Sequence, residues 1–458
     1  MGMSSNPNYA AAAGIVARLR MAGHQAFFAG GCVRDLLLGR EPKDYDVATS
    51  ATPDEVIALF QKTLTVGAHF GVVLVVGAVG ESGIATEVAT FRSDGAYSDG
   101  RRPDSVQFSS DPMEDVQRRD FTINGMLFDP AAYAATSDLN AAVLDFVGGR
   151  DDLAAGLVRA IGDPVKRFEE DKLRMLRAVR LAARLGFRIN DATFAAIVRG
   201  AAEIDHVSNE RVRDELTRIL TEGSARSGFE MLDASGLLQH VLTEGVRMHG
   251  VAQPPEFHPE GDVWTHTMLL LEKLPAGCPP TLAWGALLHD VGKPATFRAP
   301  QSVGDRIRFN GHVEVGVRMA EEICRRLRFS NEDTEQIVAL VENHMRFGDV
   351  MKMKQSTLKR FLRLPRFDEH LALHRMDCLS AHGDLTLYDF AKHEYENTPE
   401  EHMRPQLLVT GSDLIAAGYK PGPRFKEMIA FAEDAQLEGR ITTTQQGMEL
   451  LAAQPKLH

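Results

Sequence analysis

The β-strand signal of this chain is confined to about its first 150 residues, and this asymmetry limits the folds open to it. Four β-rich runs stand there among helical segments: "HQAFFAGG", "DYDVAT", "FGVVLVVGAV" and "IATEVATFR". From about Asp151 to the end, helical periodicity dominates. The sequence therefore predicts an α+β fold, in which an N-terminal mixed sheet is followed by all-α parts.

The length of the chain predicts several domains. At 458 residues it is too long for one ordinary hydrophobic core. We expect four parts, bounded where the sequence pattern shifts: 1–150, 151–240, 241–385 and 386–458.

Composition excludes some classes of protein. With 44% hydrophobic and 25% charged residues, the chain is typical of soluble globular proteins, and its longest apolar run is too short for a membrane helix. The N-terminus has no basic segment before an apolar core, and four scattered cysteines favour reduced thiols, so we expect a cytoplasmic protein without membrane contact. The net charge of −12 argues against a surface that coats nucleic acid throughout, but it allows one local basic groove.

Two aspartates follow a glycine turn in "GGCVRDLLLGREPKDYDVATS". Asp44 and Asp46 are two apart, so on a strand they share one face and repel each other unless a cation lies between them. Hard carboxylate oxygens suit Mg²⁺, and Glu87 on another β run offers a third ligand. The turn lets Gly31 and Arg34 approach a phosphate at a helix N-terminus. A bare Asp-x-Asp is more often a solvated turn, but the glycines, the arginine and the apolar exit favour a metal site.

This segment, with "EVATFRSDGAYSDGRRP", "RRDFTINGM" and "EDKLRMLRAVRLAARLGF", resembles the class II tRNA nucleotidyltransferase and bacterial poly(A) polymerase superfamily. The ordered motifs span most of residues 25–240. The resemblance implies a nucleotidyltransferase head, a helical neck, and transfer of nucleoside monophosphate from CTP or ATP to an RNA 3′ hydroxyl without a nucleic-acid template. It also assigns roles to residues, with triphosphate on Gly31 and Arg34 and metal on Asp44 and Asp46.

Further roles rest on the same resemblance. Arg119 and Asp120, before "FTIN", stand where the family contacts ribose and phosphate. Arg101 and Arg102 lie in a glycine-rich loop that helps the family to switch between nucleotides.

An Asp-Arg pair offers a way to choose the base. Asp171 and Arg174 are three apart and are expected to meet on one helical face. Cytosine and adenine both present an amino donor beside a ring-nitrogen acceptor, which a carboxylate and a guanidinium match, whereas uracil and guanine do not. Arg177 and Arg180 continue a cationic stripe suited to triphosphate and RNA. On its own, this pattern also fits an exposed helix face.

A second chemistry follows in "WTHTMLLLEKL", "WGALLHDVGKP", "FNGHVEVG" and "LVENHMRF". Histidines around a His-Asp doublet resemble the HD metal-dependent phosphohydrolases, with an unidentified divalent metal. The first site is expected from His266, His289, Asp290 and Asp377, and a second metal from His312 and His344. The domain could instead serve only as body structure.

The region "MRFGDVMKMKQSTLKRFLRLPR" carries seven basic residues against one acid. We expect an RNA contact there, or alternatively a solvated helix. The candidate RNA-binding residues are Arg346, Lys352, Lys354, Lys359 and Arg360. The terminal helical segment resembles the tail of HD-containing members.

Together these patterns predict an enzyme that builds or repairs the CCA end of tRNA from CTP and ATP and releases pyrophosphate. The alternatives are a bacterial poly(A) polymerase, an A-adding or CC-adding enzyme, or a non-catalytic nucleotide or RNA sensor. Residues 401–458 carry six basic and seven acidic side chains, so the long basic extension of proteobacterial poly(A) polymerases is missing. The retained Asp44 and Asp46 argue against a sensor. The sequence gives no indication of an oligomeric state.

Overall fold

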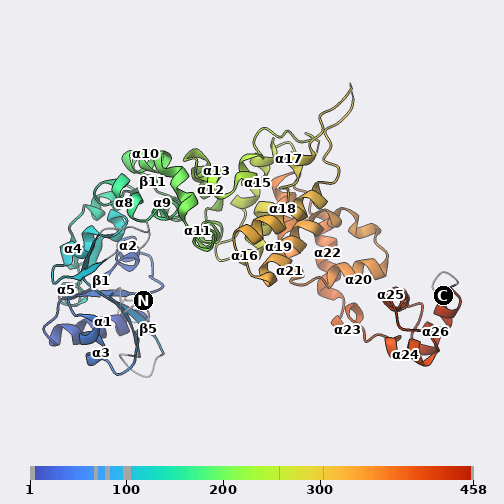
Figure 1. Ribbon diagram of the computed structural model, residues 1–458, viewed down its shortest axis with the longest axis horizontal. Helices are drawn as coiled ribbons and strands as arrows, with labels where there is room; N and C mark the ends of the chain where they lie inside the picture. Colours follow the sequence, from blue (N-terminus) through green and yellow to red (C-terminus); the bar gives the residue numbers. More distant parts are fainter. Residues whose placement is uncertain are drawn as a thin grey trace. The chain divides into compact units, whose positions relative to one another are not determined.

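A computed structural model describes residues 6–65, 71–77, 83–95, 105–256, 258–302 and 304–454. The chain forms two compact units, Met1–Thr243 and Glu244–His458. Both are shown in Figure 1, and each is described by itself below.

The first unit is built on a mixed sheet of seven strands in the order β3-β4-β5-β2-β1-β8-β9. Its strands β2 and β5 pair in parallel, and the other neighbours pair antiparallel. The strands of this sheet are β1 (Ala26–Ala29), β2 (Asp46–Thr49), β3 (Thr63–Leu64), β4 (Val72–Val76), β5 (Ala85–Thr90), β8 (Met126–Phe128) and β9 (Val143–Asp145). Two smaller ladders pair β6 (Arg92–Asp94) with β7 (Val106–Phe108) and β10 (Leu157–Val158) with β11 (Arg188–Ile189). This mixed sheet confirms the predicted α+β class.

Strand β1 shows how the sheet buries both faces. Phe27 packs in a cluster with Phe91 and Leu127. Phe28, one residue on, points to the opposite face and meets the ring of Tyr9 edge-on at 5.3 Å between centroids. Helices α1 (Pro7–Met21) and α3 (Pro53–Leu59) pack against the strands of the sheet, as Figure 1 shows.

Local signals set the ends of two early helices. Glu55 accepts a hydrogen bond from the backbone N–H of Thr52 at 2.8 Å and completes a capping box at the start of α3. Helix α2 (Gly31–Leu37) starts directly after Gly30, whose φ of 80° favours glycine.

The predicted strand around the paired aspartates is shorter than expected. Strand β2 begins at Asp46, so Asp44 lies in irregular backbone before it, and strand periodicity does not set its direction. The turn-rich segment 93–108 is not a loop throughout, because its ends form the β6–β7 ladder. Arg101 and Arg102 fall outside the described residues.

The rest of the first unit is mainly helical. Its helices are α4 (Pro112–Gln117), η3 (Thr122–Asn124), α5 (Pro130–Thr136), α6 (Leu139–Ala142), α7 (Gly149–Ala154), α8 (Pro164–Glu170), α9 (Arg174–Leu185), α10 (Asp191–Gly200), η4 (Ala201–His206), α11 (Asn209–Thr221), α12 (Ala225–Ala234) and α13 (Leu237–Val241).

The expected single helix through Asp171 is wrong. Helix α8 ends at Glu170 and α9 begins at Arg174, with Asp171 extended between them at φ −147° and ψ 104°. The Asp171 carboxylate accepts a hydrogen bond from the Leu173 N–H at 3.1 Å. An aspartate that bonds to nearby backbone in this way favours a turn over helix continuation.

The second unit is helical. Its helices are α14 (Thr243–Val246), α15 (Val263–Glu272), α16 (Pro280–Leu288), α17 (Lys293–Thr296), α18 (His312–Arg326), α19 (Asn331–Asn343), η5 (His344–Lys352), α20 (Gln355–Leu362), α21 (Phe367–Ser380), α22 (Thr386–Asn397), α23 (Glu400–Met403), α24 (Gly411–Ala416), α25 (Arg424–Leu437) and α26 (Thr444–Ala452), the first of which starts at the unit boundary. The helices from η5 to α22 and the helices α24–α26 have separate apolar clusters.

Two global properties follow from these elements. No described helix has both the length and the apolar character needed to cross a membrane. All four cysteines are buried and free.

Candidate active site and metal centre

Three carboxylates gather at one end of the head sheet. Asp46 is the first residue of β2 and Glu87 lies on β5, each one position before the paired residues Val47 and Val88. Asp46 is partly buried, whereas Asp44 and Glu87 are exposed. Burial, followed by the charges of Glu87 and Asp44, raises the pKa of Asp46 to about 7, although Arg119 opposes the rise.

Arg119 is held beside these carboxylates by a buried acid that the sequence analysis missed. Asp115 in α4 is fully buried, and its Oδ2 accepts from Arg119 Nη2 at 2.8 Å. Its Oδ1 accepts from Arg118 Nη2 at 2.6 Å. A Cβ on Gly30 would lie 3.5 Å from Arg119 Nη1 and 4.0 Å from Asp46 Oδ2, so the glycine turn lies against both groups.

Arg34 joins this site through a bridge that the sequence analysis also missed. Its buried guanidinium donates to Asp35 Oδ1 at 2.7 Å and to Asn124 Oδ1 at 2.7 Å. Asn124 in turn donates to Asp120 at 3.3 Å, and Arg177 donates to the other Asp120 oxygen at 2.7 Å. Asn124 stands inside the motif "RRDFTINGM", but motif position alone does not reveal which side chains it connects.

Asp171 and Arg174, expected to face each other on one helix, hold different partners. Asp171 accepts from Arg211 Nη2 at 2.8 Å, and Arg174 pairs with Glu170. Arg174 also donates to the backbone oxygen of Arg118 at 3.4 Å, so it reaches the segment that carries Arg119. The predicted direct pair is therefore replaced by two separate ion pairs around the helix break.

The cationic stripe of α9 is matched by acids from other elements. Arg177 bonds to Asp120, and Arg180 donates to Glu215 Oε2 at 2.7 Å and to Glu222 Oε2 at 3.1 Å. Such pairing reduces the charge that the stripe offers to a phosphate. Nucleotide contact by Arg177 and Arg180 stays a prediction.

The donor set at Asp46 suits a divalent cation. All three groups offer hard carboxylate oxygens. After burial, the charges of Glu87 and Asp44 raise the pKa of Asp46, and Arg119 does not offset them. Their oxygens do not form a group that lies wholly within 4.8 Å, which distinguishes them from the described sets in the second unit.

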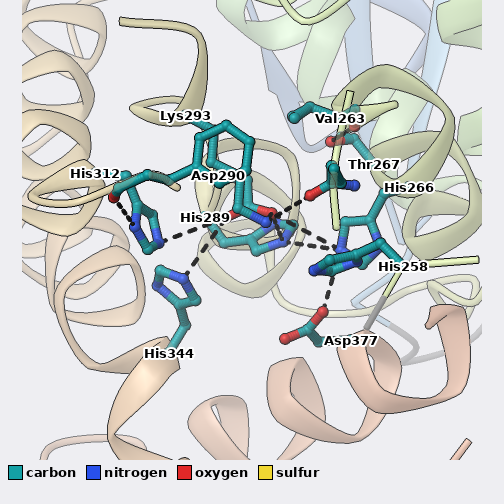
Figure 2. Close-up of polar contacts among 12 residues, drawn as sticks. His258, Val263, His266, Thr267, His289, Asp290, Lys293, His312, His344 and Asp377 are labelled. Carbon is teal, nitrogen blue, oxygen red and sulfur yellow. Dashed lines mark hydrogen bonds and ion pairs between the residues drawn. The ribbon is translucent and has the colours of Figure 1, made fainter. Parts of the chain in front are cut away.

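The second unit brings together the histidines and aspartates singled out from the sequence. Two sets of ligand atoms each lie within 4.8 Å of one another: His266, His289 and Asp377, and Asp290, His312 and His344. Figure 2 shows Asp290 between the rings of the two sets. Its Oδ1 lies 3.8 Å from His312 Nε2 and 3.7 Å from His344 Nε2, and its Oδ2 lies 3.1 Å from His289 Nε2.

Backbone carbonyls orient three of these rings. The Nδ1 atoms of His289, His312 and His344 lie 2.9, 3.0 and 2.7 Å from the carbonyl oxygens of the residues three positions earlier. Each ring therefore turns Nε2 toward the centre. The Nε2 atoms of His312 and His344 are buried and have no hydrogen-bond partner among the described residues. Imidazole nitrogens aimed at a shared carboxylate in this way fit one or two divalent metals.

The charges of the centre are strongly shifted by burial and by one another. Burial opposes the charge on His266, but the hydrogen bonds that it donates to Asp377 and Glu260 outweigh burial and raise its pKa to about 9. Burial lowers the pKa of His344 to about 4. Asp290 is also disfavoured by burial, yet His289 and Lys293 hold its pKa well below the usual range.

The sequence analysis missed three groups around this centre. Lys293 Nζ lies 2.6 Å from Asp290 Oδ2, and His258 and Glu260 form a further close set with His266. Lys293 stands in the quoted "HDVGKP", and the other two lie in a loop whose pattern carries no regular spacing.

The predicted RNA-binding segment divides into two kinds of residue. Lys352 and Lys354 are exposed. Lys359 and Arg360, by contrast, are tied to α25, with Lys359 Nζ 2.8 Å from the Leu437 oxygen and Arg360 bonded to Glu433. Arg346 lies over the ring of Phe361. RNA contact by these residues stays a prediction.

Comparison with known proteins supplies the family. Residues 26–159 match the family described as "Poly A polymerase head domain", residues 186–247 match "Probable RNA and SrmB- binding site of polymerase A", and residues 262–381 match "HD domain". A CCA-adding enzyme of Limosilactobacillus fermentum is 39% identical over 435 residues, which cover 94% of this chain and 93% of that protein. The chain belongs to the CCA-adding enzyme family. The resemblance stated from the sequence is thus confirmed.

Other relatives of the family differ in how much they cover. A CCA-adding enzyme of Geobacillus thermodenitrificans is 43% identical over 231 residues, and this match spans about half of each chain (50% and 54%). The crystal structure of the Bacillus stearothermophilus CCA-adding enzyme in complex with CTP has a TM-score of 0.73 and 26% identity, covering 98% of this chain and 99% of that one. A Thermotoga maritima CCA-adding enzyme complexed with tRNA has a TM-score of 0.56 at 18% identity over 98% and 96%, and it supports the fold alone. The matched head and HD domains imply the use of divalent metal ions.

Proposed function

We propose that this CCA-adding enzyme family member adds CMP and AMP to the 3′ end of tRNA, without a nucleic-acid template, and releases pyrophosphate. The observation that carries the proposal is the group Asp44, Asp46 and Glu87 beside Arg119 and the Gly30 turn. Carboxylates for a cation and a guanidinium for a triphosphate lie together there, as nucleotide transfer to a hydroxyl requires.

The chain's own residues divide the work. Asp44, Asp46 and Glu87 would hold Mg²⁺, which supplies activation of the RNA hydroxyl and neutralisation of the leaving pyrophosphate. Gly31 brings the first backbone amides of α2 toward the phosphates, and Arg119 adds positive charge.

A hydrogen-bonded network beside the site holds Arg34 in place. Asn124 and Asp120 link its guanidinium to that of Arg177.

Base choice falls to Asp171 and Arg174. Both lie at the break between α8 and α9, where side chains are less restricted than inside a helix. An incoming cytosine or adenine would accept from Arg174 and donate to Asp171, in exchange for part of their contacts with Glu170 and Arg211. Uracil and guanine would leave the Asp171 carboxylate and the Arg174 guanidinium without hydrogen-bond partners, so these two bases would bind more weakly.

The test uses tRNA that ends before CCA, after its first C, or after both. Each labelled nucleoside triphosphate is added alone with Mg²⁺. We expect CMP on the first two substrates and AMP on the third. Long poly(A) on unrelated RNA would instead identify a poly(A) polymerase. CMP on the first two substrates without AMP on the third would identify a CC-adding enzyme, and AMP on the third without CMP on the first two would identify an A-adding enzyme. Equal use of UTP and CTP would overturn the account of base choice.

The remaining assignments are part of the same proposal. The head spans 1–150, the neck 151–240, the HD body 241–385 and the tail 386–458. tRNA, CTP and ATP are the partners, and the exposed Lys352 and Lys354 support an RNA contact. The four free cysteines support a cytoplasmic location.

A second candidate function is favoured by the histidine centre. We propose that the HD body hydrolyses phosphoesters, including 2′,3′-cyclic phosphate ends of RNA, with a divalent metal held by His266, His289, Asp290 and Asp377 and extended by His312 and His344. A cavity of about 570 Å³ beside His312 is also lined by Arg306 and Arg308, which suits an anionic substrate. Hydrolysis of 2′,3′-cyclic AMP with Mn²⁺, Ni²⁺ or Co²⁺ should be lost in His289→Ala and kept in Asp46→Asn. No hydrolysis with any of these metals would leave the HD body as structure only.

A further inference from the structure

We propose that Glu260 is a positioning residue of the HD metal centre, because it fixes the His266 ring with Nε2 directed at the metal. This inference rests on the proposed HD metal centre and adds to it a residue that no sequence motif had assigned. Glu260 lies in the loop before α15, six positions ahead of His266.

The distances around His266 show which nitrogen has which role. Its Nδ1 lies 2.7 Å from Glu260 Oε1. Its Nε2 lies 3.1 Å from Asp377 Oδ1 and 3.3 Å from His289 Nε2. Since Glu260 occupies Nδ1, only Nε2 can face a cation shared with Asp377 and His289.

His266 is oriented differently from the other ring ligands. His289, His312 and His344 each use a backbone carbonyl at Nδ1, whereas His266 uses a carboxylate. A carboxylate pulls the Nδ1 proton more strongly than a carbonyl does and makes Nε2 a better electron donor to a metal. Glu260 is thus expected to tune His266 as well as to orient it.

Burial makes this contact persistent. The His266 side chain is 0% exposed and that of Glu260 is 7% exposed. Glu260 Oε2 is buried without a described partner.

The loop that carries Glu260 is anchored at both sides. Asp262 caps α15 by accepting from the Thr265 N–H at 2.8 Å, and its other oxygen accepts from the Gly250 N–H at 2.7 Å. His258 Nδ1 lies 2.9 Å from the same Glu260 Oε1, with its ring nearly perpendicular to that of His266. Two rings therefore hold one carboxylate oxygen in place.

The experiment measures Co²⁺ binding to the full chain, because the visible absorption band of Co²⁺ changes when imidazole nitrogens replace oxygen ligands. All proteins carry Asp46→Asn, so the head contributes little. Glu260→Gln is compared with Glu256→Gln, a matched change of an exposed glutamate in the same loop. We expect Glu260→Gln to weaken Co²⁺ binding about ten- to a hundred-fold and to change the absorption band, with an unchanged number of bound ions. Glu256→Gln should stay within about twofold of its parent.

Three outcomes would overturn the inference or what it rests on. Unchanged affinity and spectrum in Glu260→Gln would make Glu260 an anchor of the loop only. Loss of one bound ion in Glu260→Gln would mean that Glu260 is itself a metal ligand. If His289→Ala also leaves Co²⁺ binding unchanged, the proposed metal centre does not exist. This result distinguishes an error in the metal centre from an error in the role of Glu260. Should Glu260→Gln not fold, Glu260→Asp keeps the charge, shortens the reach and allows the same comparison.

Discussion

Replacing Asp46 by asparagine should stabilise the metal-free head while it abolishes nucleotide transfer. Burial, and after it the charges of Glu87 and Asp44, raise the pKa of this carboxyl from 3.8 to about 7 in the folded protein. Each pKa unit corresponds to about 1.4 kcal/mol, so the ionised form costs at most about 4 kcal/mol. Because Asp46 is only partly buried, water reduces this cost of ionisation, and we expect a gain of about 2 kcal/mol when the carboxylate is removed.

The gain must depend on pH in a defined direction. A carboxyl whose pKa is higher in the folded than in the unfolded chain binds its proton more tightly when folded. Its cost is therefore absent below about pH 4, grows as the pH rises, and is complete above about pH 7. Asparagine has no such proton, so Asp46→Asn should exceed the natural protein in stability most clearly near pH 8 and by less than half as much near pH 5.

Hydrogen exchange of the full chain, read by mass spectrometry on peptides from β1 and β2, localises the effect to the head. Without divalent metal near pH 8, these amides should exchange about thirtyfold more slowly in Asp46→Asn, the factor that corresponds to about 2 kcal/mol. Added Mg²⁺ should protect the natural protein and not the variant. Glu169→Gln, a change of an exposed glutamate in the same unit, is the control. Equal protection of variant and natural protein near pH 8, or a difference that does not shrink near pH 5, would refute the reasoning.

Three further predictions test other parts of the molecule. Arg211→Ala removes the described partner of Asp171 and should reduce the preference for CTP over UTP about tenfold in single-nucleotide addition; an unchanged ratio would separate this ion pair from base choice. His289→Ala should leave CCA addition within about twofold while HD-bound metal, measured by elemental analysis, is lost; a collapse of CCA addition would mean that the units are functionally coupled. Lys354→Ala should weaken tRNA binding and reduce by about one the slope of log binding constant against log salt concentration. Arg360→Ala should lower the melting temperature of the full chain without that change in slope. The reverse result would make Arg360 the RNA contact and Lys354 the structural residue.

The sequence by itself determined the class of fold and singled out the residues of both candidate centres. Strand-forming runs and the glycine turn at Gly30 depend on neighbours within a few residues, so local preferences sufficed to predict them. The aspartate pair and the His-Asp doublet were recognisable because metal ligation restricts which side chains can serve.

Only the tertiary structure decided which charged side chains are paired with other side chains of the protein. Arg180 meets Glu215 and Arg360 meets Glu433, partners that lie 35 and 73 residues away in the chain. Glu260 meets His266 through an irregular loop. Helical and strand periodicity describe one element at a time, whereas an ion pair depends on how two elements pack, and that packing is set by the whole hydrophobic core.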